Sequence, residues 1–77
     1  MKRIAYLAPN QEKLSRIEEV LREYKEEIIF EIGSLDAGIA TAKKLIDQGV
    51  EIIIARGETA FTIRDTFSEI VSVDVPI

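Results

Sequence analysis

The sequence predicts an α/β fold, namely a parallel four-stranded sheet in the order 2-1-3-4 that is a flavodoxin-like half of a doubly wound domain. Strand-like and helix-like segments alternate along all 77 residues in the pattern β-α-β-α-β-α-β. Connections of this length pair strands in parallel through right-handed crossovers. The segments 4–8 and 52–55 are apolar without alternation, so both faces of these strands must be covered and they should be central.

The first strand is predicted over Arg3–Ala8 and ends before Pro9, which cannot donate to a ladder. Asn10 is a good N-cap for a helix that should extend to about Lys25. The predicted buried stripe of this helix has helical spacing. It consists of Leu14, Ile17, Val20, Leu21 and Tyr24.

The second strand is predicted from about Ile28 to Ile32, followed by Gly33 and by Ser34 as the next N-cap. The second helix should reach Gln48, with Gly49 as its glycine stop. Gly38 lies inside this helix, where we expect it to permit a closer approach to the sheet. The predicted buried residues of this helix are Leu35, Ile39, Ala42, Leu45 and Ile46.

The third strand is predicted over Glu51–Ala55 and the third helix over about Glu58–Phe67, with Ala60, Ile63 and Phe67 facing inward. The fourth strand, Ile70–Val75, alternates valines with Ser72 and Asp74, so it should have one apolar and one polar face. The mixed second and fourth strands should therefore be the edges of the sheet.

This order places the first helix alone on one face of the sheet and the other two helices on the opposite face. The surface of the third and fourth strands beside the first helix then lacks a cover. Either Ser72 and Asp74 face this gap, or a second copy of the chain packs there. We therefore expect a homodimer that forms partly through this face or an edge strand.

The composition fits one small globular domain and excludes much of enzyme chemistry. The chain has 47% hydrophobic residues and lacks a long apolar segment or an export signal, which predicts a cytoplasmic protein. It contains no cysteine and no histidine, so we expect no metal site, no cofactor and no catalysis. A net charge of −4 with scattered basic residues argues against nucleic-acid or membrane binding.

The candidate site is a crevice where the strand order reverses, at the carboxyl ends of the first and third strands. Its predicted lining is Pro9, Asn10, Arg56, Gly57, Glu58 and Thr59. Amides at the start of the third helix favour an anion, and Arg56 adds a charged donor. Alternatively, Gly57 makes the turn, Thr59 caps the helix and Arg56 is solvated.

Other sequence patterns give weaker evidence for a functional site. Adjacent acidic residues at 18–19 and 26–27 diverge on a helix and indicate a solvated face. Neither a dinucleotide fingerprint nor a P-loop is present, and the serines lack a histidine to activate them. A phosphoryl-receiver domain has the same strand order but needs acidic residues where this chain has Ala8-Pro9-Asn10 and Ala55-Arg56.

Four segments in register resemble the N-terminal sensory domain of propionate catabolism activators, which are NtrC-type regulators that act with sigma-54 polymerase. The most specific is the Arg-Gly-x-Thr-Ala pattern that follows the third strand. The segments are Ile4–Pro9, Leu35–Ala40, Gly49–Ala60 and Val73–Ile77.

The resemblance implies a two-lobed receptor that binds a small organic acid between its lobes and relieves inhibition of a downstream ATPase. It also implies that residues 1–77 correspond to the first lobe. Glu58 lies where that family often has glycine, which adds an acidic side chain at the mouth of the crevice. As an isolated fragment, the chain is expected to act as a folding and self-association unit. The alternative is an engineered or excised flavodoxin-like structural fragment with no retained ligand binding.

Overall fold

The computed structural model describes residues 3–33, 35–68 and 70–74, so the predictions for Ser34 and Val75 fall outside the described residues. The elements are close to those predicted. In chain order they are β1 (Ile4–Ala8), α1 (Gln11–Val20), a 3₁₀ turn (Arg22–Tyr24), β2 (Ile28–Ile32), α2 (Leu35–Asp47), β3 (Ile52–Ala55), α3 (Gly57–Thr66) and β4 (Val71–Asp74).

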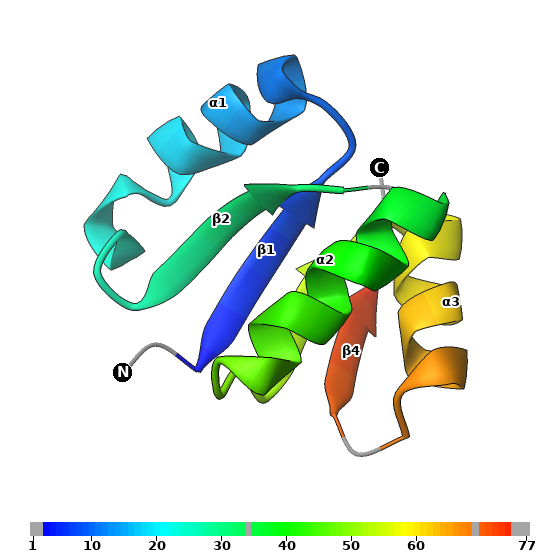
Figure 1. The fold of residues 1–77 in the computed structure, drawn as a ribbon. Helices are drawn as coiled ribbons and strands as arrows, with labels where there is room; N and C mark the ends of the chain where they lie inside the picture. The colour runs from blue at the N-terminus through cyan, green and yellow to red at the C-terminus, as the bar shows by residue number, and fades with distance from the viewer. Residues whose placement is uncertain (1–2, 34, 69, 75–77) are drawn as a thin grey trace.

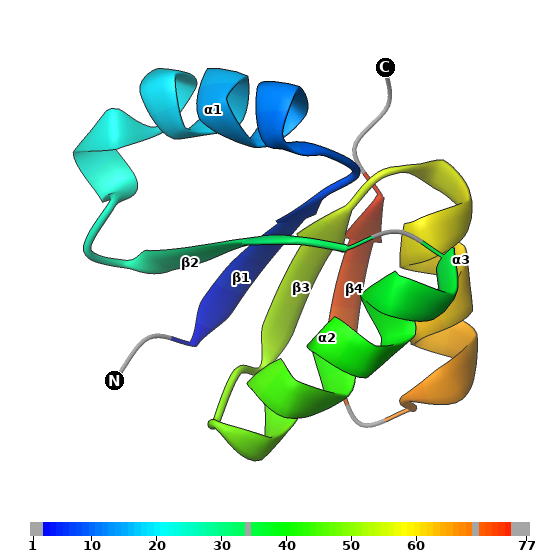
Figure 2. The same cartoon turned by 45° about the horizontal axis from the view of Figure 1, so that its top comes forward.

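The strands form one parallel sheet in the order β2-β1-β3-β4, which confirms the predicted fold class. Figure 1 shows α2 and α3 in front of this sheet, and Figure 2 shows α1 on its opposite side. The apolar strands β1 and β3 are central, and β2 and β4 are the edges. This arrangement brings the ends of β1 and β3 together.

The first helix is shorter than predicted. It ends at Val20, and the chain then tightens into the 3₁₀ turn. Leu14 is buried as predicted, but Val20 and Tyr24 are 71% and 49% exposed, so their predicted burial is wrong. Val20 lies roughly 120° around the helix from Leu14, on its flank. The tighter turn rotates Tyr24 away from the sheet.

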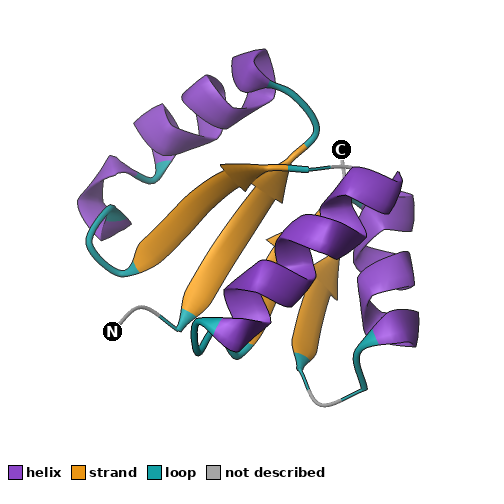
Figure 3. Cartoon of the chain, viewed as in Figure 1, coloured by secondary structure: helices purple, strands orange, loops and turns teal. Residues whose placement is uncertain are grey.

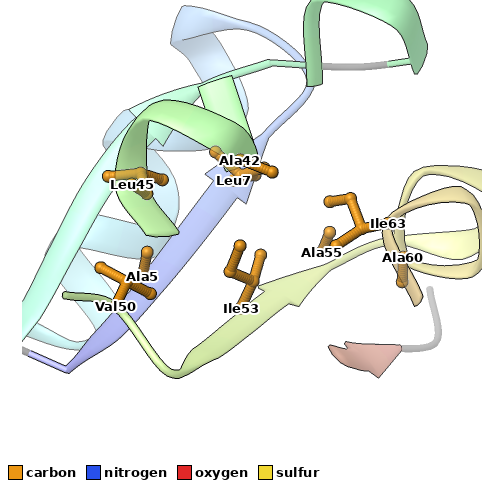
Figure 4. Close-up of a cluster of buried hydrophobic side chains, with 9 residues drawn as sticks. All are labelled: Ala5, Leu7, Ala42, Leu45, Val50, Ile53, Ala55, Ala60 and Ile63. Atoms are coloured by element: carbon orange, nitrogen blue, oxygen red, sulfur yellow. The ribbon is translucent and has the colours of Figure 1, made fainter. Parts of the chain in front are cut away.

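The main core lies between the sheet and the helices α2 and α3 (Figure 4). Small alanines from strands and helices allow close packing around the larger side chains. The largest fully buried side chains are Leu7, Leu45, Ile53 and Ile63. Gly49 has φ 104° and ends α2, as its predicted role as a glycine stop requires.

A smaller core lies under α1. It contains Tyr6, Ala8, Leu14 and Ile28, with Ile54 and other half-buried side chains packed against it. The rings of Tyr6 and Phe30 are 6.5 Å apart between centroids. Since α1 covers mainly β1 and β2, this core stops before β4.

The polar face of β4 points toward α3, not toward the uncovered surface. Ser72 Oγ donates a hydrogen bond of 2.7 Å to the Ala60 carbonyl oxygen, and Asp74 bonds to the start of α3. The alternating valines must therefore point the other way. The first alternative for this surface, that Ser72 and Asp74 face the gap, is wrong, because their hydroxyl and carboxylate find partners on α3.

The uncovered surface is an apolar strip made of Ile52, Ile54, Val71 and Val73. The register pairs Ile52 with Val71 and Ile54 with Val73, so all four side chains share one face. The isoleucines are half-buried, whereas the valines are 58% and 40% exposed. We refer to these four residues as the uncovered strip.

Gly38 permits a close contact that differs from the predicted approach of helix to sheet. A Cβ atom placed on Gly38 would lie 3.0 Å from Thr59 Cγ2 and 3.4 Å from the carbonyl carbon of Gly33. The glycine therefore brings α2 against α3 and against the residue that follows β2. This contact places Thr59, in the first turn of α3, against α2.

Candidate functional site

The two loops predicted to line the site lie at the same edge of the sheet. β1 and β3 are parallel neighbours, with Tyr6 aligned to Ile54. The segments that follow them, Pro9–Asn10 and Arg56–Gly57, therefore begin side by side. Figure 3 shows the loop after β1 at the carboxyl end of the sheet, and Figure 2 shows the chain passing from β3 into α3 at the same end.

On the β1 side, Asn10 has a structural role. It is the N-cap of α1, as predicted, and its Oδ1 accepts a hydrogen bond of 2.9 Å from the Lys13 amide. Pro9 and Asn10 are both exposed. The cap occupies Asn10 Oδ1, so the side-chain NH₂ is the group of Asn10 that can donate to an anion.

On the β3 side, Arg56 occupies the N-cap position of α3 with an extended backbone, and its side chain makes no capping hydrogen bond. It is half-buried, whereas Glu58 is exposed. Arg56 is thus a cationic residue at the positive end of a helix, and this combination favours a carboxylate or phosphate.

Gly57 begins α3 with φ 52°, in the left-handed region that glycine adopts without strain. Its amide donates a hydrogen bond of 2.8 Å to Asp74 Oδ1. A carboxylate of the chain itself therefore already accepts a hydrogen bond from the first backbone amide of this helix. Among the described residues, the next amide, that of Glu58, donates no hydrogen bond.

Thr59 is buried at the contact between α3 and α2. It is 9% exposed, and its methyl group faces Gly38 of α2. Its amide bonds to the Arg56 carbonyl oxygen at 3.1 Å. Since Arg56 holds the N-cap position, the alternative in which Thr59 caps α3 is wrong. The buried methyl instead helps to hold α3 in place.

Asp74 is the residue of this region that the sequence analysis did not assign to the site. The signal for it was available, because the order β3-β4 places the end of β4 beside the end of β3. The register aligns Asp74 with Ala55, one residue before Arg56. Asp74 therefore lies where an acidic side chain can reach the start of α3.

A small hollow of about 100 Å³ lies between α3 and β4. It shares Asp74 with this region but none of the six predicted site residues. Its lining residues are Ala60, Phe61, Arg64, Ser72 and Asp74.

The family model described as propionate catabolism activator matches residues 22–77, which is well over half of the chain. The chain belongs to this family. The match includes β2, α2, β3, α3 and β4, and so the Arg56–Thr59 loop, whereas Pro9 and Asn10 precede it. No curated protein and no solved structure shows significant similarity to the chain.

Membership of this family makes the chain a regulatory sensory domain of a propionate catabolism activator. None of the helices in the described segments is long and apolar enough to cross a lipid bilayer.

Proposed function

We propose that this chain is a ligand-sensing lobe that binds a small organic acid between the loops after β1 and β3. The observation that carries the proposal is the hydrogen bond of 2.8 Å from the Gly57 amide to the Asp74 carboxylate, since it places a carboxylate oxygen at the start of α3. A ligand carboxylate would bind beside or in place of Asp74, with Arg56 and the Glu58 amide as further donors.

In this proposal the lobe acts by binding and not by catalysis. Ligand binding would relieve inhibition of a downstream ATPase in a sigma-54-dependent regulator of the NtrC type, in the cytoplasm. The lobe itself would not contact nucleic acid, because a net charge of −4 opposes binding to a phosphate backbone. One lobe covers half of a cleft, so the affinity of this chain for its ligand should be weak.

Titration with 2-methylcitrate or citrate should shift the amide NMR signals of Gly57 and Glu58. We expect a dissociation constant of about 1 mM, which corresponds to about −4 kcal/mol. Arg56→Ala should weaken binding by about tenfold, because a charge-assisted hydrogen bond to a carboxylate is lost.

Arg64→Ala is the matched control for the titration, since it removes the same charge from the last turn of α3, at the other end of the helix from Arg56. It should leave the dissociation constant nearly unchanged. If neither tricarboxylate shifts the Gly57 or Glu58 signals, the chain is a structural fragment without retained binding, which is the alternative function.

We further propose that two copies associate through the uncovered strip. The exposed Val71 and Val73 support this, because contiguous apolar surface of this kind marks interaction sites. Sedimentation at tens of micromolar should give the mass of a dimer. Combining Val71→Lys with Val73→Lys should give a monomer, whereas Val20→Lys, on α1, should not. A wild-type monomer at these concentrations would contradict the proposal.

A further inference from the structure

Two basic residues differ from the others of the described segments in their surroundings. Lys13, in the first turn of α1, and Arg56, at the N-cap of α3, are half-buried, whereas the remaining described lysines and arginines are exposed. Within the described residues, neither is at ion-pair distance from a carboxylate. Both lie at the positive end of a helix, where a cation is disfavoured and an anion is stabilised. These surroundings favour a negatively charged ligand beside them.

The Arg56 side chain leaves β3 on the face of the sheet that carries α1. Ile53 and Ala55 belong to the main core, whereas Ile54 packs against the smaller core under α1. The backbone of Arg56 is still extended, with φ −108° and ψ 137°, so the alternation of side chains continues through it. Arg56 therefore shares the face of Ile54. Asp74, which is aligned with Ala55, points to the opposite face, where it bonds to Gly57.

Lys13 lies on the flank of α1 that faces β3. Leu14 is buried against the sheet, and one residue of a helix corresponds to a rotation of 100°. In a right-handed crossover from β1 through α1 to β2, the residue before Leu14 is turned toward β3 and the residue after it toward β2 (Figures 1 and 2). The burial of the two neighbours agrees with this orientation, since Lys13 is half-buried and Ser15 is exposed.

The two basic residues also lie at the same edge of the sheet. The register aligns Tyr6 with Ile54, and two residues farther along both strands it brings Ala8 level with Arg56. Lys13 is held close to the loop after Ala8, because its amide donates a hydrogen bond of 2.9 Å to Asn10 Oδ1. Adjacent strands are only about 4.8 Å apart, so two long side chains that start here on one face can reach a shared anion.

We propose that Lys13 is a second cationic binding residue of the ligand site, and that Lys13 and Arg56 hold one carboxylate group of the ligand between them on the α1 face. This inference rests on the proposed function. The guanidinium offers paired donors to a carboxylate, and the ammonium group adds a point charge. The Glu58 amide at the start of α3 then remains for another carboxylate of the same ligand.

The test is a titration of the whole chain with citrate, followed by NMR. We expect the side-chain Cε signal of Lys13 to shift together with the amide signals of Gly57 and Glu58, with one dissociation constant. Lys13→Ala should weaken citrate binding by about fivefold, the upper end of the range for a partly exposed ion pair. Lys13→Arg keeps the charge, so it should weaken binding by about twofold or less.

Lys44→Ala is the matched control. It removes an exposed lysine from the last turn of α2, on the opposite face of the sheet, and should leave citrate binding unchanged. Combining Lys13→Ala with Arg56→Ala should weaken binding by less than the product of the two single losses, because both groups hold the same carboxylate. Amide spectra that match the wild type away from the two loops would show that each variant is folded.

The outcomes separate this inference from the proposed function. If citrate shifts Gly57 and Glu58 but binds Lys13→Ala as tightly as the wild type, the inference is wrong and the proposed function stands. Equal weakening by Lys13→Ala and Lys44→Ala would reduce the effect to net charge and also overturn the inference. Shifts at Lys13 and Arg56 without shifts at Gly57 and Glu58 would support the cation pair and contradict the site at the start of α3. No shift at any of these residues with millimolar citrate would overturn both.

Discussion

Replacing Ile53 with alanine should lower the free energy of unfolding by about 2–5 kcal/mol, the cost of deleting a buried aliphatic side chain and leaving a cavity. Ile53 is 0% exposed and lies on a central strand, facing α2 and α3 (Figure 4). A chain of 77 residues has a total stability of about 4–12 kcal/mol. Urea denaturation should therefore show a midpoint far below that of the wild type.

Two matched variants separate the cavity from general effects of substitution. Ile53→Val removes one methylene and should cost about 0.5–1.5 kcal/mol. Val71→Ala, on exposed β4 of the same sheet, should change stability by about 0.5 kcal/mol or less. A loss for Ile53→Ala no larger than that for Val71→Ala would mean that β3 does not lie in the centre of the core.

The strand order could be predicted because the central strands are distinctive in sequence. The segment Ile52–Ala55 has no polar residue, which requires cover on both faces and excludes an edge position. Pro9, Asn10 and Gly49 mark where the first strand and the first two helices start or stop. These signals are local, so the sequence alone is sufficient to read them.

Which face of β4 turns toward the helices could not be predicted from the sequence. Alternation defines two faces of a strand but does not say which of them packs against the rest of the protein. The common expectation is that valines face a core and polar residues face water. Here Ser72 and Asp74 have partners on α3, at Ala60 and Gly57, and the valines are left in the uncovered strip. The hydrogen bonds that accompany this orientation join β4 to the preceding helix, and they depend on how α3 packs on the sheet.

The position of the loops that carry the candidate site could be predicted, whereas the orientation of some of their side chains could not. The rule that parallel sheets bind ligands at the carboxyl ends of their strands placed Pro9–Asn10 and Arg56–Glu58 at one edge of the sheet, where the fold has them. The buried position of Thr59 and the bond from Asp74 to Gly57 depend on how α3 is rotated against α2. That rotation is a property of tertiary packing, which spacing along the chain does not reveal.

Replacing Gly38 with valine should cost about 1–3 kcal/mol, the usual effect of overpacking a tight contact. Its Cβ would lie 3.0 Å from Thr59 Cγ2, and the branched methyl groups would extend farther into the contact between α2 and α3. The melting temperature should fall by roughly 4–8 °C for each kcal/mol lost.

The control for Gly38→Val is Ala40→Val, an exposed position of the same helix, where only helix propensity changes and the cost should be about 0.7 kcal/mol or less. Thr59→Ser removes the methyl group that Gly38 faces, so it should recover part of the loss when combined with Gly38→Val. The same displacement of α3 would move the Gly57 amide away from Asp74, and its NMR signal should shift in Gly38→Val but not in Ala40→Val. Equal losses for the two valine variants would show that α2 and α3 have room between them, and that the start of α3 is not fixed by this contact.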